Sequence, residues 1–145
     1  MSNKNVAKVL HNVLSNSYAL ALKTQNYHWN VVGANFKSLH ELFGAQYEEL
    51  SEAIDEIAER IRALDILVPA SFDVFGKESK IKNGNENAKT LAMVKELYND
   101  NQTLTKILYD ALKIVQKEGD EGTADMLIGR IQAHDKNAWM LKSSL

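Results

Sequence analysis

Two histidines and a pair of carboxylates are the side chains in this sequence that could hold a metal ion. His28 and His40 are separated by eleven residues, and Asp55 and Glu59 are separated by three. Imidazole together with carboxylates is a ligand set that suits iron, manganese or zinc. A metal centre is therefore the chemistry that these residue types favour.

His40 and the two carboxylates fall on one long predicted helix. Apolar residues recur at helical spacing from Phe36 to Leu64, which predicts an amphipathic helix over that range. At about 100° per residue, His40, Asp55 and Glu59 share one stripe, roughly 150° away from the apolar face. A stripe that points away from its own core meets either water or another molecule.

The length of this helix limits how a metal site could be built. His40 and Asp55 are fifteen positions apart, which places them roughly 22 Å apart along the axis. One ion cannot contact both within one chain. If a second copy packs antiparallel on this face about a two-fold axis, His40 of one copy lies opposite Asp55 and Glu59 of the other. The break at residues 32–35 returns His28 to the side of His40, so we predict a metal site shared between subunits.

Each of these signals also has a plainer interpretation. Acids four residues apart are common on solvated helix faces, and most histidines are surface or structural residues. Only their combination on one stripe favours a site. We interpret His11 as structural, and His134 as part of a solvated or interface pair with Asp135. Trp29, next to His28, either packs or donates electrons to a redox metal.

Three acids stand at the start of the last predicted helix: Asp120, Glu121 and Asp125. Their charges suit the positive end of the helix dipole, which explains them within one chain. If three copies met at this point, the same acids would line a pore that attracts cations.

Composition narrows the class of protein. The chain has 145 residues, which fits a single domain spanning 1–145, and its net charge of −2 does not indicate a nucleic-acid partner. It contains no Cys, so disulfides and thiolate metal sites are excluded, and a reducing cytoplasm is the expected location. No apolar run approaches the length of a membrane span, so no membrane association is expected.

The pattern of elements predicts an all-α, ferritin-like four-helix bundle. Besides the helix already described, long helices are predicted from near Asn3–Val6 to about Asn30, from 88 to 117 and from 122 to 142. Gly33 and Asn35 mark the first turn, with Asn35 as N-cap, and Gly119 ends the third long helix. The segment 66–88 contains Pro69 and reads as a long crossover between the second and third long helices, with a short helix near 71–75. The last two long helices are expected to turn these residues inward: Leu91, Val94, Leu97, Tyr98, Leu104, Leu108, Ala111, Leu112, Val115, Leu127, Ile128, Ile131, Ala138 and Leu141.

One motif of many ferritin-like proteins is absent. Di-iron bundles often carry Glu-x-x-His on their own helices and bind metal inside the bundle. No Glu-x-x-His occurs in this sequence. Its absence argues against a centre within one chain and favours the alternative between subunits.

Several stretches together resemble the Dps family of mini-ferritins, and the likeness covers nearly the whole chain. The matching stretches are His28–Val31, Phe36, Leu39–Phe43, Asp55–Ile61, Gly119–Asp125 and His134–Leu141. The resemblance implies a homododecameric shell built on two-fold and three-fold interfaces. Ferroxidase centres would lie at the two-fold interfaces, with both histidines from one subunit and Asp55 and Glu59 from its neighbour. Iron would be oxidised there, preferably by hydrogen peroxide, and stored as ferric mineral, which protects against oxidative damage; Asp120 and Asp125 match the region of the iron-entry pores.

The sequence departs from the family at Gly44, where an acidic ligand usually follows the second histidine by four residues. Glycine supplies no ligand and costs a helix about 1 kcal/mol relative to Ala. Glu48 lies on the same stripe, so it or a water could substitute. We therefore expect a two-iron centre in which the site of His28, Asp55 and Glu59 survives and the second site, around His40, is weakened.

Two other functions stay open at this point. The chain could form a DNA-coating shell with a vestigial metal site, or a helical assembly without catalysis. Only Lys4 and Lys8 supply positive charge before His11, and the sequence ends at Lys142 and three further residues. With so few charges to displace phosphate counterions, we do not expect stable DNA binding at physiological salt.

Overall fold

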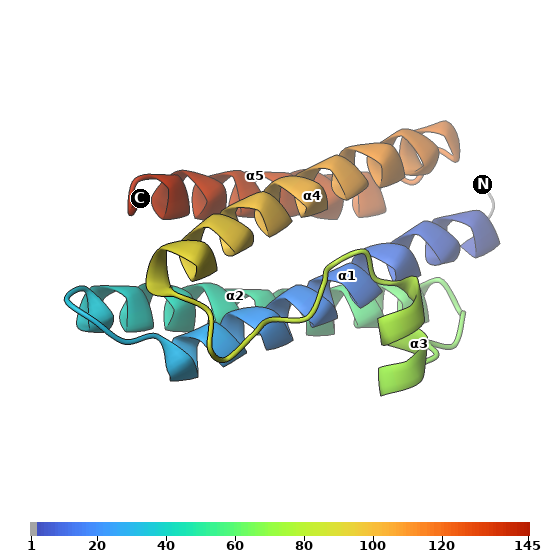
Figure 1. Cartoon of the computed structure of the whole chain (residues 1–145). Helices are drawn as coiled ribbons and strands as arrows, with labels where there is room; N and C mark the ends of the chain where they lie inside the picture. The colour runs from blue at the N-terminus through green and yellow to red at the C-terminus, as the bar shows by residue number, and fades with distance from the viewer. Residues whose placement is uncertain (1–2) are drawn as a thin grey trace.

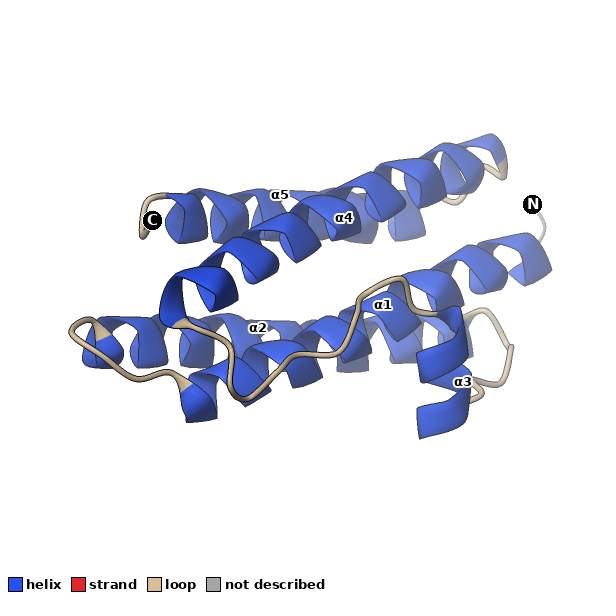
Figure 2. Cartoon of the chain, viewed as in Figure 1, coloured by secondary structure: helices blue, strands red, loops and turns tan. Residues whose placement is uncertain are grey.

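The structure, a computed structural model, describes residues 3–145 and contains helices but no strands over that range. The four long helices are α1 (Asn3–Asn30), α2 (Phe36–Ala63), α4 (Thr90–Lys117) and α5 (Glu121–Lys142). α1 and α2 form one hairpin, α4 and α5 form a second, and the two hairpins stack on each other (Figures 1 and 2). The short α3 (Phe72–Glu78) lies at one end of the bundle. The predicted all-α bundle is thereby confirmed. No helix in the described part of the chain combines the length and the apolar character needed to cross a bilayer.

The direction of the helices explains the long crossover. α1 and α5 run one way along the bundle, whereas α2 and α4 run the other way (Figure 1). The chain must therefore return along the whole bundle between the end of α2 and the start of α4. Hydrogen bonds along its length hold this return path beside α1 and the turn that follows it. Lys80 N donates to Asn16 Oδ1 (2.8 Å), and Asn85 N donates to the Tyr27 hydroxyl (3.2 Å). Thr90 Oγ1 donates to the carbonyl of Val32, just past α1 (2.7 Å).

Most of the predicted helix limits agree with the structure to within two residues. α4 begins at Thr90 rather than 88, and α3 extends beyond its predicted end at 75 to Glu78. Asn35 occupies the N-cap position of α2, but its side chain makes no capping hydrogen bond. Gly119 takes a positive φ of 77° in the turn between α4 and α5, the conformation for which glycine is preferred after a helix.

Two residues predicted to face inward do not. Leu91 is 63 % exposed and Ile128 is 40 % exposed, so these predictions were wrong. The inward face of α4 is set by Met93, Val94 and Leu97, and Leu91 lies about 110° around the helix from it. Ile128 lies about 100° from the direction of the buried residues of α5. Hydrophobicity alone did not distinguish side chains at the edge of the inward face from those within it.

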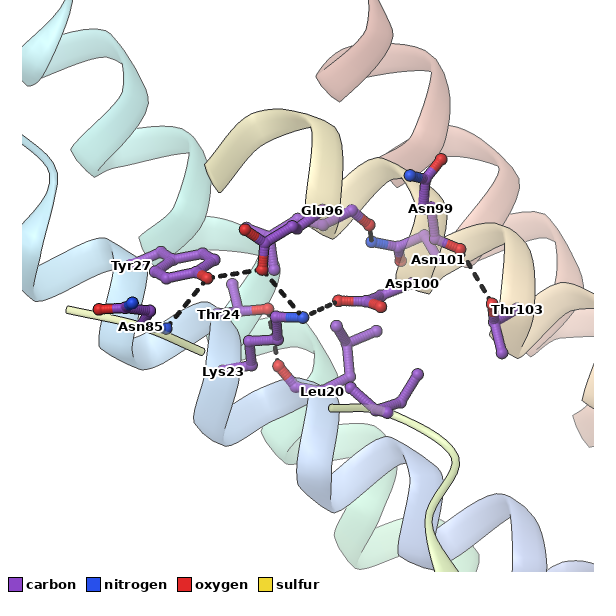
Figure 3. Close-up of polar contacts among 12 residues, drawn as sticks. Leu20, Lys23, Thr24, Tyr27, Asn85, Glu96, Asn99, Asp100, Asn101 and Thr103 are labelled. Atoms are coloured by element: carbon purple, nitrogen blue, oxygen red, sulfur yellow. Dashed lines mark hydrogen bonds and ion pairs between the residues drawn. The ribbon is translucent and has the colours of Figure 1, made fainter. Parts of the chain in front are cut away.

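A polar cluster joins α1 to α4 on the side where the crossover runs (Figure 3). Lys23 is 5 % exposed, and its Nζ lies 2.9 Å from Asp100 Oδ2 and 3.3 Å from Glu96 Oε1. The Tyr27 hydroxyl also donates to Glu96 Oε1 (2.7 Å). Burial, and then the neighbouring Glu96, raise the pKa of Tyr27 to about 12. Burial likewise raises the pKa of Asp100, although Lys23 opposes the shift. The cluster pairs a buried cation with two acids, as a buried charge requires.

A second polar contact ties the start of α5 to α2. Asp120 caps α5 by accepting from the backbone N of Thr123 (3.0 Å) and from its hydroxyl (2.6 Å). Arg60, from α2, donates to Asp120 (3.1 Å) and to Thr123 Oγ1 (2.9 Å). Burial alone would raise the pKa of Asp120, but the bonds from Thr123 and the charge of Arg60 outweigh it, and the net shift is downward.

We predict that Asp120→Ala lowers the free energy of unfolding by about 1–2 kcal/mol at neutral pH, because it removes a helix cap and leaves Arg60 with one partner fewer. The folded-state pKa of Asp120 lies below its unfolded value, so this stabilisation is fully present above about pH 4 and is lost as the pH falls through the folded-state pKa. Urea denaturation at pH 7 and near pH 3 measures both effects. Glu121→Ala, an exposed acid in the same turn, is the control and should cost less. Equal stability of Asp120→Ala and the unmodified protein at pH 7 would contradict the prediction.

Candidate metal centre

His28 and His40 lie face to face at the closed end of the α1–α2 hairpin. Their ring centroids are 3.9 Å apart and the rings are within 12° of parallel. The Nδ1 of His28 lies 2.6 Å from the carbonyl oxygen of His40, and the Nδ1 of His40 lies 2.6 Å from the carbonyl oxygen of His28. The turn at residues 31–35 makes this contact, because it brings the last residues of α1 alongside the first turns of α2.

These reciprocal hydrogen bonds determine what each ring can bind. A carbonyl oxygen only accepts, so each Nδ1 must carry the proton and donate it. Nε2 is then the nitrogen of each ring that can offer a lone pair to a metal. Histidine ligands in proteins are commonly held in this way, with one nitrogen bonded to a carbonyl or carboxylate and the other on the metal. The donor set of this pair therefore fits a metal such as iron.

The carboxylate half lies further along α2. Asp55 and Glu59 are exposed and one helical turn apart. A hydrogen bond between the two carboxyl groups, together with the negative charge of Asp55, raises the pKa of Glu59. Two acids close enough to share a proton are also close enough to share a cation. Within residues 3–145, however, no three His, Asp or Glu side chains gather as a metal site. The chain therefore carries a histidine pair and a carboxylate pair that are separate from each other.

Gly44 lies against the His28 ring, a contact that sequence reasoning missed. A Cβ built on Gly44 would lie 2.8 Å from His28 Cε1 and 3.0 Å from its Nδ1. A glycine inside a predicted helix, one turn after a candidate ligand, is the sequence signal that could have indicated such a close approach. Tyr47, in the next turn, stacks more distantly on His28, at 6.4 Å between centroids.

The auxiliary site residues remain predictions that the isolated chain does not test. Trp29 is 62 % exposed beside the histidine pair. Glu48, Glu121 and Asp125 are exposed as well. Asp120 differs from them, since it is 5 % exposed and bound to Thr123 and Arg60.

The two other histidines have structural partners. His11 Nε2 lies 2.7 Å from the carbonyl of Pro69, and its Nδ1 lies 2.8 Å from Glu78 Oε2. His11 therefore fastens α1 to the crossover, in agreement with its structural interpretation. Its acidic partner comes from a distant part of the sequence, which is why helical spacing did not reveal it.

His134 is fully buried, so the prediction of a solvated or interface residue was wrong. Its Nδ1 lies 2.8 Å from Asn101 Oδ1, and Arg130, which bonds to Glu49 of α2, donates to its Nε2 at 3.2 Å. Burial, and then the charge of Arg130, lower the pKa of His134 to about 3, so the ring is neutral. Its spacing from Ile131 places it on the inward face of α5, a signal that the sequence did contain.

Comparison with known proteins agrees with this fold. The model of the ferritin-like domain matches residues 7–145. An uncharacterised low temperature-induced protein of Nostoc sp. is 40 % identical, over 95 % of this chain and 78 % of its own length. DNA protection during starvation protein 2 of Bacillus anthracis is 34 % identical, over 99 % and 98 %. The crystal structure of a Dps protein from Vibrio cholerae O1, described as a member of a superfamily of ferritin-like diiron-carboxylate proteins, superposes with a TM-score of 0.93 at 31 % identity, over 97 % of this chain and 89 % of that one.

A family model that spans almost the whole chain, a relative of nearly the same length and a solved structure that superposes on the whole bundle all agree with this fold. The chain belongs to the ferritin-like domain family and, within it, to the Dps family of mini-ferritins.

Proposed function

We propose that this protein is an iron-sequestering mini-ferritin that oxidises Fe(II), with hydrogen peroxide as oxidant, at centres shared between two copies of the chain. The observation that carries the proposal is the reciprocal hydrogen bonding of His28 and His40, which leaves both Nε2 atoms available to a metal. Ferric mineral would be stored inside the assembly, and removal of Fe(II) and peroxide together would limit oxidative damage. A cytoplasmic location remains part of the prediction.

The assembly follows from the separation of the two ligand pairs. A two-fold axis that sets the α1–α2 face of one copy against the same face of another would place His28 and His40 opposite the partner's Asp55 and Glu59. The face carries exposed apolar side chains that a partner would cover, among them Leu22 and Trp29. With three-fold contacts added, the family's homododecameric shell results, and Glu121 and Asp125 would be the exposed acids of its pores.

Fe(II) enters this scheme as a substrate, together with peroxide. Two Fe(II) ions supply the two electrons that convert one hydrogen peroxide and two protons to two waters, which leaves two Fe(III). The role of the chain is to hold the ions. The fixed imidazoles supply neutral nitrogen ligands from one side, and the carboxylates supply charge and oxygen ligands from the other.

The charge of the ligand set supports unequal affinity for the two ions. Asp55 and Glu59 together carry two negative charges, which neutralise one divalent ion but not two. With Gly44 in place of an acid, position 44 adds no negative charge next to the rings. We therefore propose one tight Fe(II) site, made by His28 with the partner's acids, and one weak site near His40 that Glu48 or water completes.

Mixing two defective variants should restore activity if the centres are shared. We predict that a protein with both His28→Ala and His40→Ala, and another with both Asp55→Asn and Glu59→Gln, are each inactive in peroxide-dependent Fe(II) oxidation. When the two are co-expressed in equal amounts, half of the pairs are mixed, and each mixed pair holds one intact and one empty centre. About a quarter of the wild-type activity should return. If each centre were built within one chain, mixing would restore none, so that result would reject the shared site.

The difference in affinity between the two Fe(II) sites can be measured by titration. We predict that anaerobic titration of the metal-free shell with Fe(II) shows one tight ion per centre, followed by a second that binds much more weakly. Calorimetry gives both stoichiometries, and the His28→Ala variant should lose the tight phase. Two equally tight ions per centre would contradict the proposed effect of Gly44.

A DNA-coating shell with a weakened metal centre is the second candidate function, and the name of the Bacillus anthracis relative is the observation in its favour. The net charge of −2 argues against it.

A gel-shift assay over a salt series separates the two candidates. We expect no stable complex with duplex DNA at physiological salt and little response to salt below it. A protein with several phosphate contacts would instead bind at low salt and lose affinity steeply as salt rises. Such a curve would favour the DNA-coating function over iron chemistry alone.

A further inference from the structure

We propose that Gly44 is a positioning residue of the metal centre, because the space that a side chain there would fill is occupied by the imidazole of His28. The effect on metal binding rests on the proposed function, whereas the contact between Gly44 and His28 is observed in the single chain. It assigns Gly44 a positive role, whereas the sequence indicated only a lost ligand.

The contact is too close for any side chain to be added without a rearrangement. A Cβ at position 44 would approach His28 Cε1 to 2.8 Å, Nδ1 to 3.0 Å and Nε2 to 3.6 Å. Carbon atoms that are not bonded to each other prefer a separation of about 3.5–4.0 Å. Either α2 moves away from α1 or the ring moves, and α2 is anchored by the fully buried Phe43 directly beside position 44.

The His28 ring has little freedom to make way. Its Nδ1 donates to the His40 carbonyl at 2.6 Å, and its face stacks on His40 at 3.9 Å. Phe36 in turn stacks on His40, at 5.1 Å between centroids, so a shift of His40 would disturb that contact as well. A displacement of a few tenths of an ångström would lengthen the hydrogen bond that fixes the tautomer and direction of His28. Glycine at position 44 lowers the stability of the helix, but it leaves the space in which the His28 ring is held.

The two histidines should respond differently to a change at Gly44. His40 is held by its own hydrogen bond to the carbonyl of His28, which belongs to the backbone of α1 and does not depend on the His28 ring. A side chain at position 44 therefore displaces the His28 ring and leaves His40 in place.

The test compares Gly44→Ala with Gly129→Ala in the full-length, metal-free assembly. Both replace a glycine inside a helix, but a Cβ at Gly129 would meet no atom within 4 Å. Each variant is crystallised, and its affinity for Zn(II), a redox-inert probe, is measured by calorimetry. We expect Gly129→Ala to keep the wild-type affinity and to raise Tm, since alanine favours the helix.

For Gly44→Ala we expect a folded protein in which the His28 ring has left the carbonyl of His40, and in which the tight site binds Zn(II) about 10- to 100-fold more weakly, as is typical when a ligand loses its orienting contact. A His28 ring that stays in place with unchanged Zn(II) affinity would overturn the inference, and so would a displaced ring with unchanged affinity. If the wild type binds no Zn(II) at this face, the proposed function fails, yet the crystal structure of Gly44→Ala still shows whether Gly44 sets the position of His28.

Discussion

Two short hydrogen bonds between His28 and His40 are the contacts on which the proposed chemistry depends. They close the end of the α1–α2 hairpin and set the tautomer of both rings in the same step. Each bond contributes about 1 kcal/mol to stability by itself, a small share of the total. Their larger effect is geometric: both imidazoles are fixed in the metal-free chain, so an incoming ion does not have to order them first.

The interior of the bundle supplies the rigidity that this arrangement needs. Apolar clusters occupy both halves of the bundle, and polar contacts connect the helices around them. Lys23 joins α1 to α4, the Glu49, Arg130 and His134 network joins α2 to α5, and Asp120 joins the start of α5 to α2. Each of these side chains has at least one polar partner, although Arg130 Nε is buried without a hydrogen bond. None of them belongs to the candidate metal ligands, so these contacts between helices do not depend on the metal centre.

Much of the fold could be read from periodicity, because an amphipathic helix must turn one apolar face inward wherever it packs. The long helices, the crossover and its short helix, and the turns at Gly33 and Gly119 followed from apolar spacing and from Gly and Pro. The inward-facing prediction failed at Leu91 and Ile128, which lie to the side of the buried face. The hydrophobic pattern of one helix does not tell how much of its surface the neighbouring helices cover. His134 shows the opposite error, since a polar residue on the inward face was assigned to the surface.

The sequence by itself determined which residues could form the centre and that one chain could not complete it, because helix geometry fixes the separation of His40 from Asp55. Only the tertiary structure decided how the histidines are presented, since hydrogen bonds between residues of α1 and α2 depend on how closely the two helices pack. The same packing decides which side chain lies against Gly44. In the sequence, Gly44 shows only that a carboxylate is missing. In the fold, the His28 ring occupies the space that a side chain at position 44 would need.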